Sequence, residues 1–337
     1  MRRPGMLRHL RPVVVLLGVS GVPHCLAQAP SGRDASQAAP CGSVMACERA
    51  YSLRLSSFVP EPNRVSGAIL EARINGGPPL RLLLDSGASY ITLDARASAR
   101  SAVSAASESH LVGIGESPAR PARSGVAVAV EVGPLRLGNC RIDVAPGRLA
   151  QGIDGVIPLS LFGGFLIRLD LPGKVLDLTP YADRAAPTAG YAHAIVKRDL
   201  LFMRAALNGA LEGYILLDTG ASYSAVSHGA AQALRSALVS TVGLRGANGA
   251  VDGDLIEAAV QFHVAGWNLT AEPIVALDLA GFSAFNGVET IGVLGYPALR
   301  DSMLTVSYRD AMVHLDAPPK GGKGRTSMAE KEEAGAN

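Results

Sequence analysis

The sequence is poor in aromatic residues, in charged residues and in long apolar runs. Of its 337 residues, 5% are aromatic, with a single tryptophan, and 18% are charged, whereas 48% are hydrophobic. This balance excludes an intrinsically disordered chain, because enough apolar side chains are present to fill one large core or two moderate ones. The 38 glycines and 21 prolines leave only short apolar runs between them, which is typical of short strands and tight turns. We therefore expect an all-β fold with few short helices.

Two kinds of ligand site are missing from the sequence. The seven histidines form no HxxxH or HExxH pair, and the cysteines of CGSVMAC at 41–47 do not have a metal-binding spacing, so we expect neither a metal site nor a cofactor. Basic residues form no stripe with interleaved aromatics. The formal net charge of +2 includes the four arginines at positions 2, 3, 8 and 11, and without them the net charge is near −2 (2 − 4 = −2). Nucleic acid is therefore not an expected partner.

The N-terminus has the layout of an export signal. Four arginines precede the apolar run VVVLLGVSGV at 13–22, and Ala27 stands where a signal peptidase would cut. The run is too short for a stable membrane anchor, and no later uncharged stretch has the length of a transmembrane helix. We expect residues 1–27 to be a signal peptide and the protein to be exported, either to the periplasm or to the medium.

Three cysteines remain after such a cleavage, namely Cys41, Cys47 and Cys140. In an oxidising compartment, Cys41 could close a small loop with Cys47. The same spacing is equally compatible with unpaired thiols in a mobile segment. The sequence leaves both alternatives open.

One stretch of the chain occurs twice. LLLDSGASY at 82–90 corresponds to ILLDTGASY at 215–223, and the offset is 133 residues (218 − 85 = 133). In each copy an alternating strand, at 67–74 and at 201–207, leads to an Asn-Gly pair, which is a strong hairpin signal between apolar runs. A repeat of this extent indicates one structural unit built twice.

The repeat continues downstream. DGVIPLSLF at 154–162 corresponds to IGVLGYPAL at 291–299, and each copy closes with a hairpin, at 165–178 and at 303–316. The expected organisation is a signal peptide at 1–27, a mobile N-terminal segment at 28–50, an N-terminal lobe at 51–180, a linker at 181–190, a C-terminal lobe at 191–316 and a disordered tail at 317–337.

In each copy an aspartate ends the apolar strand and is followed by a hydroxyl residue and a glycine. The glycine permits a sharp turn, and the hydroxyl can form a hydrogen bond within it. If a pseudo-twofold axis relates the copies, Asp85 and Asp218 face one another, and two like charges this close hold one proton between them. Such a pair can act as base on a water molecule and as acid on a scissile carbonyl.

With these features the chain resembles the bilobal aspartic peptidases of the pepsin and retropepsin superfamily. Their signature is two hydrophobic residues and Asp-Thr/Ser-Gly, followed later in each lobe by hydrophobic-hydrophobic-Gly. Asp85-Ser86-Gly87 and Asp218-Thr219-Gly220 match the first element, and Val293-Leu294-Gly295 matches the second. The resemblance covers residues 65–316. It implies two β lobes with a cleft between them, a peptide substrate, catalytic roles for Asp85 and Asp218, and hydrogen bonds of Ser86 and Thr219 across the axis.

The first lobe departs from the family pattern at two places. Pro158 stands where the second element usually has glycine. A flap tyrosine of the pepsin kind is missing, because no tyrosine occurs between Tyr90 and Tyr181. We expect Gly-rich hairpins to cover the substrate instead, with binding residues Gly113, Ile114 and Gly115 in one lobe and Arg245 and Gly246 in the other.

Alanine follows the glycine of both turns, at Ala88 and Ala221. A hydroxyl at these positions would stabilise the carboxylate and lower its pKa, whereas alanine cannot. We therefore expect activity at a pH closer to neutral than that of a stomach enzyme.

The predicted function is that of an aspartic endopeptidase which acts as a monomer, because both aspartates belong to one chain. One alternative is a peptide-binding protein that keeps the cleft but has lost catalysis. A remote alternative is a subtilisin-like serine protease that uses Asp218, His228 and Ser327. The short separation of Asp218 and His228 speaks against it, because it leaves little room for the intervening strands and helix.

Overall fold

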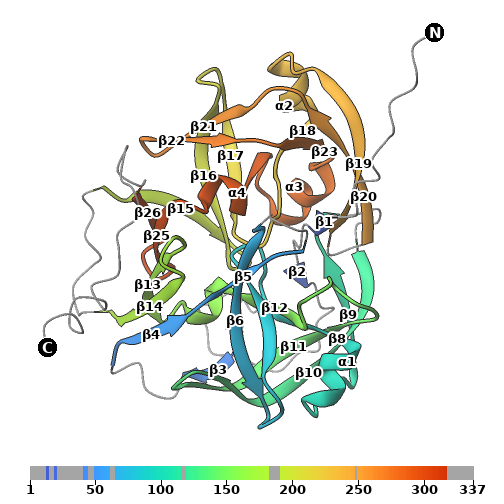
Figure 1. Ribbon diagram of the computed structural model, residues 1–337, viewed down its shortest axis with the longest axis vertical. Coiled ribbons are helices and arrows are strands. Elements are labelled where there is room, and N and C mark those ends of the chain that lie inside the picture. The colour runs from blue at the N-terminus through green and yellow to red at the C-terminus, as the bar shows by residue number, and fades with distance from the viewer. Residues whose placement is uncertain are drawn as a thin grey trace, which may run out of the picture.

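The computed structural model describes residues 13–14, 19–20, 41–44, 49–60, 65–114, 119–181, 190–246 and 249–316. Within them, strands predominate and each helix is short; α3, for example, covers the seven residues Ala280–Asn286. The strands gather into two lobes (Figure 1). The predicted all-β, two-lobed fold is confirmed. The predicted tail, most of the linker and most of the leader lie outside the described residues.

The first lobe is built on one sheet with the order β2-β9-β10-β11-β8-β12-β7-β6-β5, and β3 adds to β11. Its elements are β2 (Val19–Ser20), β3 (Cys41–Val44), β5 (Ser56–Phe58), β6 (Gly67–Ile74), β7 (Leu80–Asp85), β8 (Ile91–Asp94), α1 (Ala95–Arg100), β9 (Ser107–Val112), β10 (Ala119–Val132), β11 (Leu135–Ala145), β12 (Gly155–Pro158) and the 3₁₀ helix η1 (Leu159–Phe162).

The second lobe repeats the plan with the order β1-β19-β20-β23-β18-β24-β17-β16, and β21 and β22 form a side hairpin on β16. Its elements are β1 (Val13–Val14), β16 (Leu200–Leu207), β17 (Leu211–Asp218), β18 (Ser224–Ser227), α2 (His228–Ala233), β19 (Leu238–Gly246), β20 (Gly249–Ile256), β21 (Val260–Val264), β22 (Trp267–Ala271), β23 (Ile274–Leu277), α3, β24 (Thr290–Gly295) and α4 (Tyr296–Leu299).

A further run of strands joins the lobes. Its order is β4 (Tyr51–Arg54), β14 (Val175–Pro180), β13 (Phe165–Asp170), β25 (Met303–Ser307), β26 (Met312–Asp316) and β15 (Ala192–Lys197), and it continues into β16. The central contact is the antiparallel pairing of β13 with β25, in which Ile167 lies opposite Val306. Both halves of the sequence therefore contribute strands to one shared sheet.

The repeat has the same register in both lobes. In the first hairpin Ile69 pairs with Leu83, and 133 residues later Phe202 pairs with Leu216 (69 + 133 = 202; 83 + 133 = 216). Both hairpins turn at Asn-Gly in the left-handed region, with φ of 51° and 72° at Asn75 and Gly76. Asn and Gly adopt this conformation readily, and it matches the twist of the flanking strands. The predicted hairpins are confirmed.

The cysteine pairing differs from both sequence-based alternatives. Cys41 forms a disulfide with Cys140, 99 residues away, because β3 pairs with β11 and places Cys41 opposite Cys140. The expectation of a Cys41–Cys47 loop is therefore wrong. The expectation of unpaired thiols is also wrong for Cys41. Cys47 lies outside the described residues. Within the segment predicted to be mobile, 28–50, the structure describes β3 and residues 49–50, and mobility of this segment stays a prediction.

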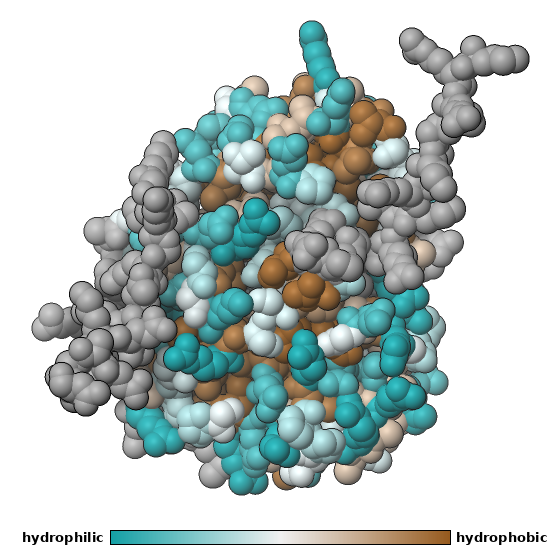
Figure 2. All heavy atoms as spheres, in the orientation of Figure 1, coloured by the Kyte–Doolittle hydropathy of each residue, from teal (hydrophilic) through white to brown (hydrophobic). Residues whose placement is uncertain are grey.

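The surface mixes polar and apolar side chains. Hydrophilic and hydrophobic residues are interspersed over the face seen in Figure 2, including the region between the lobes. In the part of the chain that the structure describes, none of the helices has the length and hydropathy needed to cross a membrane.

Candidate active site

Asp85 and Asp218 end two equivalent central strands, β7 and β17. Each strand has a parallel neighbour whose last residue lies beside the aspartate, Pro158 of β12 beside Asp85 and Gly295 of β24 beside Asp218. Both aspartates are fully buried. The turn after Asp218 touches the first carboxyl group, because a Cβ atom added to Gly220 would lie 2.4 Å from Cγ of Asp85. The fold therefore brings the two predicted aspartates together.

Pro158 and Gly295 occupy matching places but meet different surroundings. Proline is tolerated at 158 because it ends the strand and begins η1, with φ of −70° and ψ of 142°, a conformation that its ring favours. At Gly295, by contrast, an added Cβ would lie 2.4 Å from the backbone oxygen of Tyr223. The departure at Pro158 thus leaves the strand beneath Asp85 in register.

Four hydrogen bonds tie the two turns together across the lobe boundary. The backbone N–H of Ser86 donates to Oγ1 of Thr219 at 3.0 Å, and the N–H of Thr219 donates to Oγ of Ser86 at 3.0 Å. The two hydroxyls then donate across the boundary, Ser86 to the carbonyl of Leu217 at 2.8 Å and Thr219 to the carbonyl of Leu84 at 2.9 Å. All four bonds are buried, so each replaces solvation that these groups have lost.

The turns also hold the carboxyl groups directly. The N–H of Gly87 donates to Oδ1 of Asp85 at 2.6 Å, and the N–H groups of Gly220 and Ala221 both donate to Oδ1 of Asp218 at 2.9 Å. Oδ2 of each aspartate is buried without a donor among the described residues, and each carboxyl group changes the pKa of the other. A proton shared by the pair would give these oxygens a partner.

Burial sets the ionisation of the pair. Removal from water raises the pKa of Asp85 well above its ordinary value, and the negative charge of Asp218 raises it further. Burial likewise raises the pKa of Asp218 to about 7, against the hydrogen bonds from Asp85, Ala221 and Gly220, which lower it. Because the two groups interact strongly, they titrate as a pair and retain a proton near neutral pH.

Comparison with known proteins agrees with this geometry. A family model described as "Aspartyl protease" matches residues 70–161 and 203–298, so that each lobe carries one match. The chain belongs to the aspartyl protease family. The resemblance noted in the sequence is thereby confirmed.

The fold of this aspartyl protease family member is also found among solved structures. The crystal structure of aspartic proteinase from Irpex lacteus matches with a TM-score of 0.51 at 12% sequence identity, over 80% of this chain and 97% of that chain. At this identity the match shows the fold alone. A search of curated protein sequences gives no match.

Two hairpins of this aspartyl protease family member reach from one lobe to the other. In the first lobe, β9 and β10 form a hairpin, and Ile114 beyond β9 is 2% exposed in the same buried cluster as Leu216 and Tyr223 of the second lobe. In the second lobe, β19 and β20 form a hairpin in which Arg245 donates from Nη1 to the carbonyl of Arg148 in the first lobe, at 3.0 Å. We name these the first and second covering hairpins. Gly115 lies outside the described residues.

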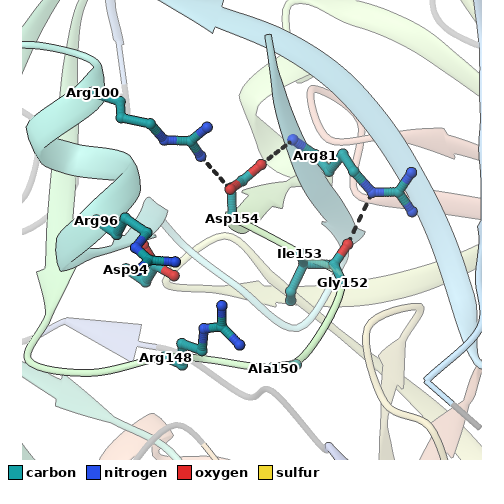
Figure 3. Close-up of a pocket in the computed structure, with 9 residues that line it drawn as sticks. All are labelled: Arg81, Asp94, Arg96, Arg100, Arg148, Ala150, Gly152, Ile153 and Asp154. Atoms are coloured by element: carbon teal, nitrogen blue, oxygen red, sulfur yellow. Dashed lines mark hydrogen bonds and ion pairs between the residues drawn. The ribbon is translucent and has the colours of Figure 1, made fainter. Parts of the chain in front are cut away.

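The loop at 146–154 receives the second covering hairpin and is itself firmly held (Figure 3). The Asp154 carboxylate accepts from the backbone N–H of Arg81 and pairs with Arg100, while Nε of Arg81 donates to the carbonyl of Gly152. Leu149 and Ala150 of this loop belong to a buried cluster with Ala88, which follows the first Asp-Ser-Gly turn. The loop therefore forms a fixed apolar wall between that turn and the hairpin.

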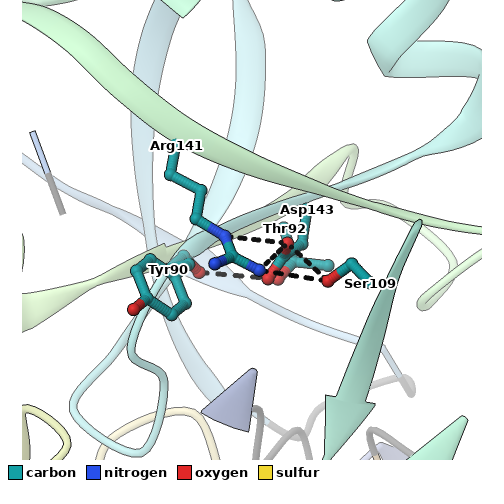
Figure 4. Close-up of polar contacts among 5 residues, drawn as sticks. All are labelled: Tyr90, Thr92, Ser109, Arg141 and Asp143. Atoms are coloured by element: carbon teal, nitrogen blue, oxygen red, sulfur yellow. Dashed lines mark hydrogen bonds and ion pairs between the residues drawn. The ribbon is translucent and has the colours of Figure 1, made fainter. Parts of the chain in front are cut away.

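The two tyrosines that follow the turns have different environments. Tyr90 is stacked beneath the Arg141 guanidinium, whose Cζ lies 4.5 Å from the ring centroid (Figure 4). Arg141 also pairs with the buried Asp143 at 3.1 Å. Tyr223 instead lies in the apolar cluster of the second lobe. Tyr90 thus belongs to a polar network with Arg141 and Asp143.

Sequence reasoning missed a third carboxylate between the lobes. Asp199 lies in the turn between β15 and β16, with φ of 67°, and Ser89 donates its hydroxyl to the carbonyl of the preceding Arg198. Burial raises the pKa of Asp199 to about 6. Burial raises the pKa of Tyr308, and the charges of Asp199 and Asp85 raise it further. The repeat offered one signal, because Asp199 stands where the first lobe has Ser66 (199 − 133 = 66).

Of the residues in the serine-protease alternative, the two that the structure describes have other partners. Nε2 of His228 lies 3.2 Å from Oδ2 of Asp254, and Asp218 is engaged with Asp85, while Ser327 lies outside the described residues. Among the described residues there is also no group of three or more His, Cys, Asp or Glu side chains placed to hold a metal ion.

Proposed function

We propose that this aspartyl protease family member is an active endopeptidase that hydrolyses peptide bonds with Asp85 and Asp218. The observation that carries the proposal is the pair of buried, interacting carboxyl groups at the ends of equivalent strands. Each carboxyl is held by backbone N–H groups, and the turns are locked together across the lobes. Catalysis by a carboxyl pair requires this kind of fixed geometry.

The mechanism uses the single proton of the pair. The ionised carboxylate takes a proton from a water molecule as that water attacks the scissile carbonyl, and the protonated carboxyl transfers its proton to the carbonyl oxygen. A tetrahedral gem-diol results. Its collapse breaks the C–N bond while one carboxyl transfers a proton to the leaving nitrogen and the other takes the proton of one gem-diol hydroxyl. The dyad returns to its one-proton state, so no covalent intermediate is formed.

The raised pKa values imply activity near neutral pH. Below about pH 7, Asp218 is protonated as well as Asp85, and the pair then has no carboxylate to act as base. We therefore expect kcat/KM to fall as the pH is lowered from 7 to 5. An activity maximum under strongly acidic conditions would contradict this expectation.

The decisive experiment is hydrolysis of a peptide library by the protein and by two variants. Asp85→Asn and Asp218→Asn each remove one carboxyl group and preserve shape, so we expect a loss of activity of at least about 100-fold in each. Asp301→Asn serves as the control, because Asp301 is exposed on the second lobe. Peptide binding without hydrolysis by the unaltered protein would identify the non-catalytic peptide-binding alternative.

We further propose that the protein is exported and acts as a monomer. The Cys41–Cys140 disulfide supports export, because disulfides persist in oxidising compartments. A single chain supplies both aspartates, so activity does not require a second copy. Fractionation of producing cells, with the mass of the recovered chain, tests export and removal of residues 1–27. Activity that depends on protein concentration through dimer formation would contradict the monomer.

A further inference from the structure

A cavity on the first lobe lies between α1, the start of β7 and the 146–154 loop (Figure 3). Its volume is about 380 Å³, which is within the range of pockets that bind small molecules. Ala150 and Ile153 of its lining are buried and belong to an apolar cluster of the first lobe. None of the described residues that line the cavity belongs to the two aspartate turns. The charged residues of the lining are Arg81, Asp94, Arg96, Arg100, Arg148 and Asp154.

The charges of this lining do not cancel. Four arginines and two aspartates leave a formal net charge of +2 (4 − 2 = 2). Both carboxylates already have partners. Oδ1 of Asp94 accepts from the N–H of Ala97 at 2.7 Å, and Asp154 accepts from the backbone N–H of Arg81 and pairs with Arg100. The positive charge in excess is therefore carried by the other guanidinium groups.

Two guanidinium groups are available to a ligand. In the part of the chain that the structure describes, those of Arg96 and Arg148 make no hydrogen bond or ion pair. Both residues are exposed, and Figure 3 shows them on the same side of Asp154. Like charges gathered around one cavity repel each other, and a bound anion would replace this repulsion by attraction.

The backbone around the cavity is fixed by its own hydrogen bonds. The N–H of Asp154 donates to the carbonyl of Arg81 at 2.9 Å, and the N–H of Asp94 donates to the carbonyl of Asp154 at 3.0 Å. The carbonyl of Arg148 accepts the bond from Arg245 of the second covering hairpin. A preformed backbone lowers the entropy that binding must offset, because only side chains are left to be ordered.

The internal repeat shows that the fold does not need these arginines. α1 and α2 are equivalent, since they begin and end 133 residues apart (228 − 95 = 233 − 100 = 133). The second-lobe residues that stand at the places of Arg81, Arg96 and Arg100 are Tyr214, Gly229 and Ala233 (214 − 81 = 229 − 96 = 233 − 100 = 133). None of the three is charged, yet the second lobe forms the same strand, turn and helix. The arginines of the first lobe therefore point to a role other than folding.

We propose that this cavity is a binding site for a phosphate monoester, and that Arg96, Arg100 and Arg148 hold the phosphate. A phosphate monoester carries a charge of about −1.5 to −2 at pH 7, which matches the excess of +2. A guanidinium group donates two parallel N–H bonds to phosphate oxygens, and its planar fork fits this geometry. A monocarboxylate would offset only half of the excess. The site does not depend on the proposed endopeptidase activity, because neither aspartate of the dyad takes part.

The test is isothermal titration calorimetry of the full chain with glycerol 3-phosphate, at constant ionic strength. We expect saturable binding, and at least about tenfold weaker binding of acetate, which has half the charge. The double variant Arg96→Gln/Arg148→Gln should bind glycerol 3-phosphate at least about tenfold more weakly, because its charge-assisted hydrogen bonds are lost. No binding by the unaltered chain would overturn the proposal.

The matched control is Arg54→Gln/Arg136→Gln, which removes the same charge from two exposed positions outside the cavity. Its affinity for glycerol 3-phosphate should equal that of the unaltered chain within about twofold, because distant exposed charges are screened. An equal loss of affinity in both double variants would overturn the proposal, because a general effect of surface charge would then explain the binding. Urea unfolding midpoints of both variants show that each is folded.

A lipid head group presents the same phosphate chemistry as a free small molecule. Vesicles of phosphatidylcholine with and without phosphatidate, sedimented with the unaltered chain and with Arg96→Gln/Arg148→Gln, distinguish the two sources. Sedimentation that requires both phosphatidate and the arginines would support the site and identify a lipid head group as the source. Binding of glycerol 3-phosphate without sedimentation would support the site with a free small molecule as the source.

Discussion

At the residue scale, the dyad combines deep burial with few hydrogen-bond donors. Asp218 accepts from the backbone N–H groups of Gly220 and Ala221 through Oδ1, and the side chain of Ala221 has no hydroxyl to add to them. Burial therefore dominates the ionisation and raises the pKa of both aspartates. A carboxyl that keeps its proton in the folded protein but loses it in the unfolded chain makes stability depend on pH.

The first residue-scale prediction concerns that dependence. The pKa of Asp218 is raised from 3.8 to about 7, so between these values the folded state binds more protons than the unfolded state. Stability should therefore decline as the pH rises from about 4 to about 7. Asn at 218 removes this penalty, so Asp218→Asn should gain stability relative to the unaltered protein on going from pH 4 to pH 7. Urea unfolding midpoints at the two pH values test this, and an unchanged difference would contradict it.

The second residue-scale prediction concerns Gly220. A Cβ at this position would lie 2.4 Å from Cγ of Asp85 and 2.5 Å from its Oδ2, so the carboxyl group must move. We expect Gly220→Ala to reduce kcat by at least about 100-fold through misplacement of Asp85. Gly243→Ala is the matched control, because a Cβ there meets nothing within 4 Å. Equal kcat values for the two variants would contradict this prediction, because they would show that the turn accommodates the Cβ atom without misplacing Asp85.

At the element scale, the covering hairpins depend on contacts that cross the lobe boundary. The first hairpin buries Ile114 in the cluster of the second lobe, and the second holds the 146–154 loop through Arg245. The contact of Arg245 does not involve the strands that carry the aspartates, whereas Ile114 shares its cluster with Leu216 of β17. Because both aspartates are fully buried, entry of a peptide requires the covering hairpins to move.

The prediction at this scale uses Ile114. Truncation to Ala removes buried apolar contact that stabilises only the closed hairpin, at a cost of about 2 kcal/mol. We expect Ile114→Ala to lower kcat/KM by roughly tenfold, mainly through a higher KM. Val126→Ala, on the exposed part of β10, should leave both constants unchanged. Steady-state kinetics on one peptide measure all three proteins, and a fall in kcat alone would contradict the assigned role.

The elements that could be predicted from the sequence are those set by local chemistry. Asn75-Gly76 specifies its hairpin through the left-handed backbone that these residues adopt, and the repeated Asp-Ser/Thr-Gly triplets specify the turns of the dyad. Ile114, Arg245 and Asp199 depend on how the lobes meet, and no local pattern encodes that. Their packing is decided by side chains far away in the sequence, so only the structure reveals it.

At the scale of the whole molecule, the disulfide closes a long segment of the first lobe. Cys41 and Cys140 are 99 residues apart in sequence, and a spacing rule based on nearby cysteines favours Cys47 instead. The correct pairing depends on β3 lying along β11, a long-range contact that the cysteine spacing alone does not reveal. A cross-link over so many residues restricts the unfolded chain strongly.

The prediction at this scale follows from that restriction. Cys140→Ser should lower the free energy of unfolding by roughly 2–4 kcal/mol, and Cys41→Ser should have the same effect because it breaks the same bond. Cys47→Ser is the matched control and should leave stability unchanged. Urea denaturation of the three oxidised variants measures the differences. A loss of stability in Cys47→Ser equal to that of the other two would contradict the Cys41–Cys140 pairing.

The sheet shared by the lobes has a consequence for the integrity of the molecule. β13 and β25 come from opposite halves of the chain, yet they are joined by a backbone ladder from Ile167–Val306 to Asp170–Met303. A nick in the connecting segment near 181–190 would therefore cut one covalent link and leave this ladder intact. The two fragments would remain associated as a heterodimer to which each contributes one aspartate. A cleaved preparation that gives two bands on a denaturing gel would therefore keep its activity and its native size.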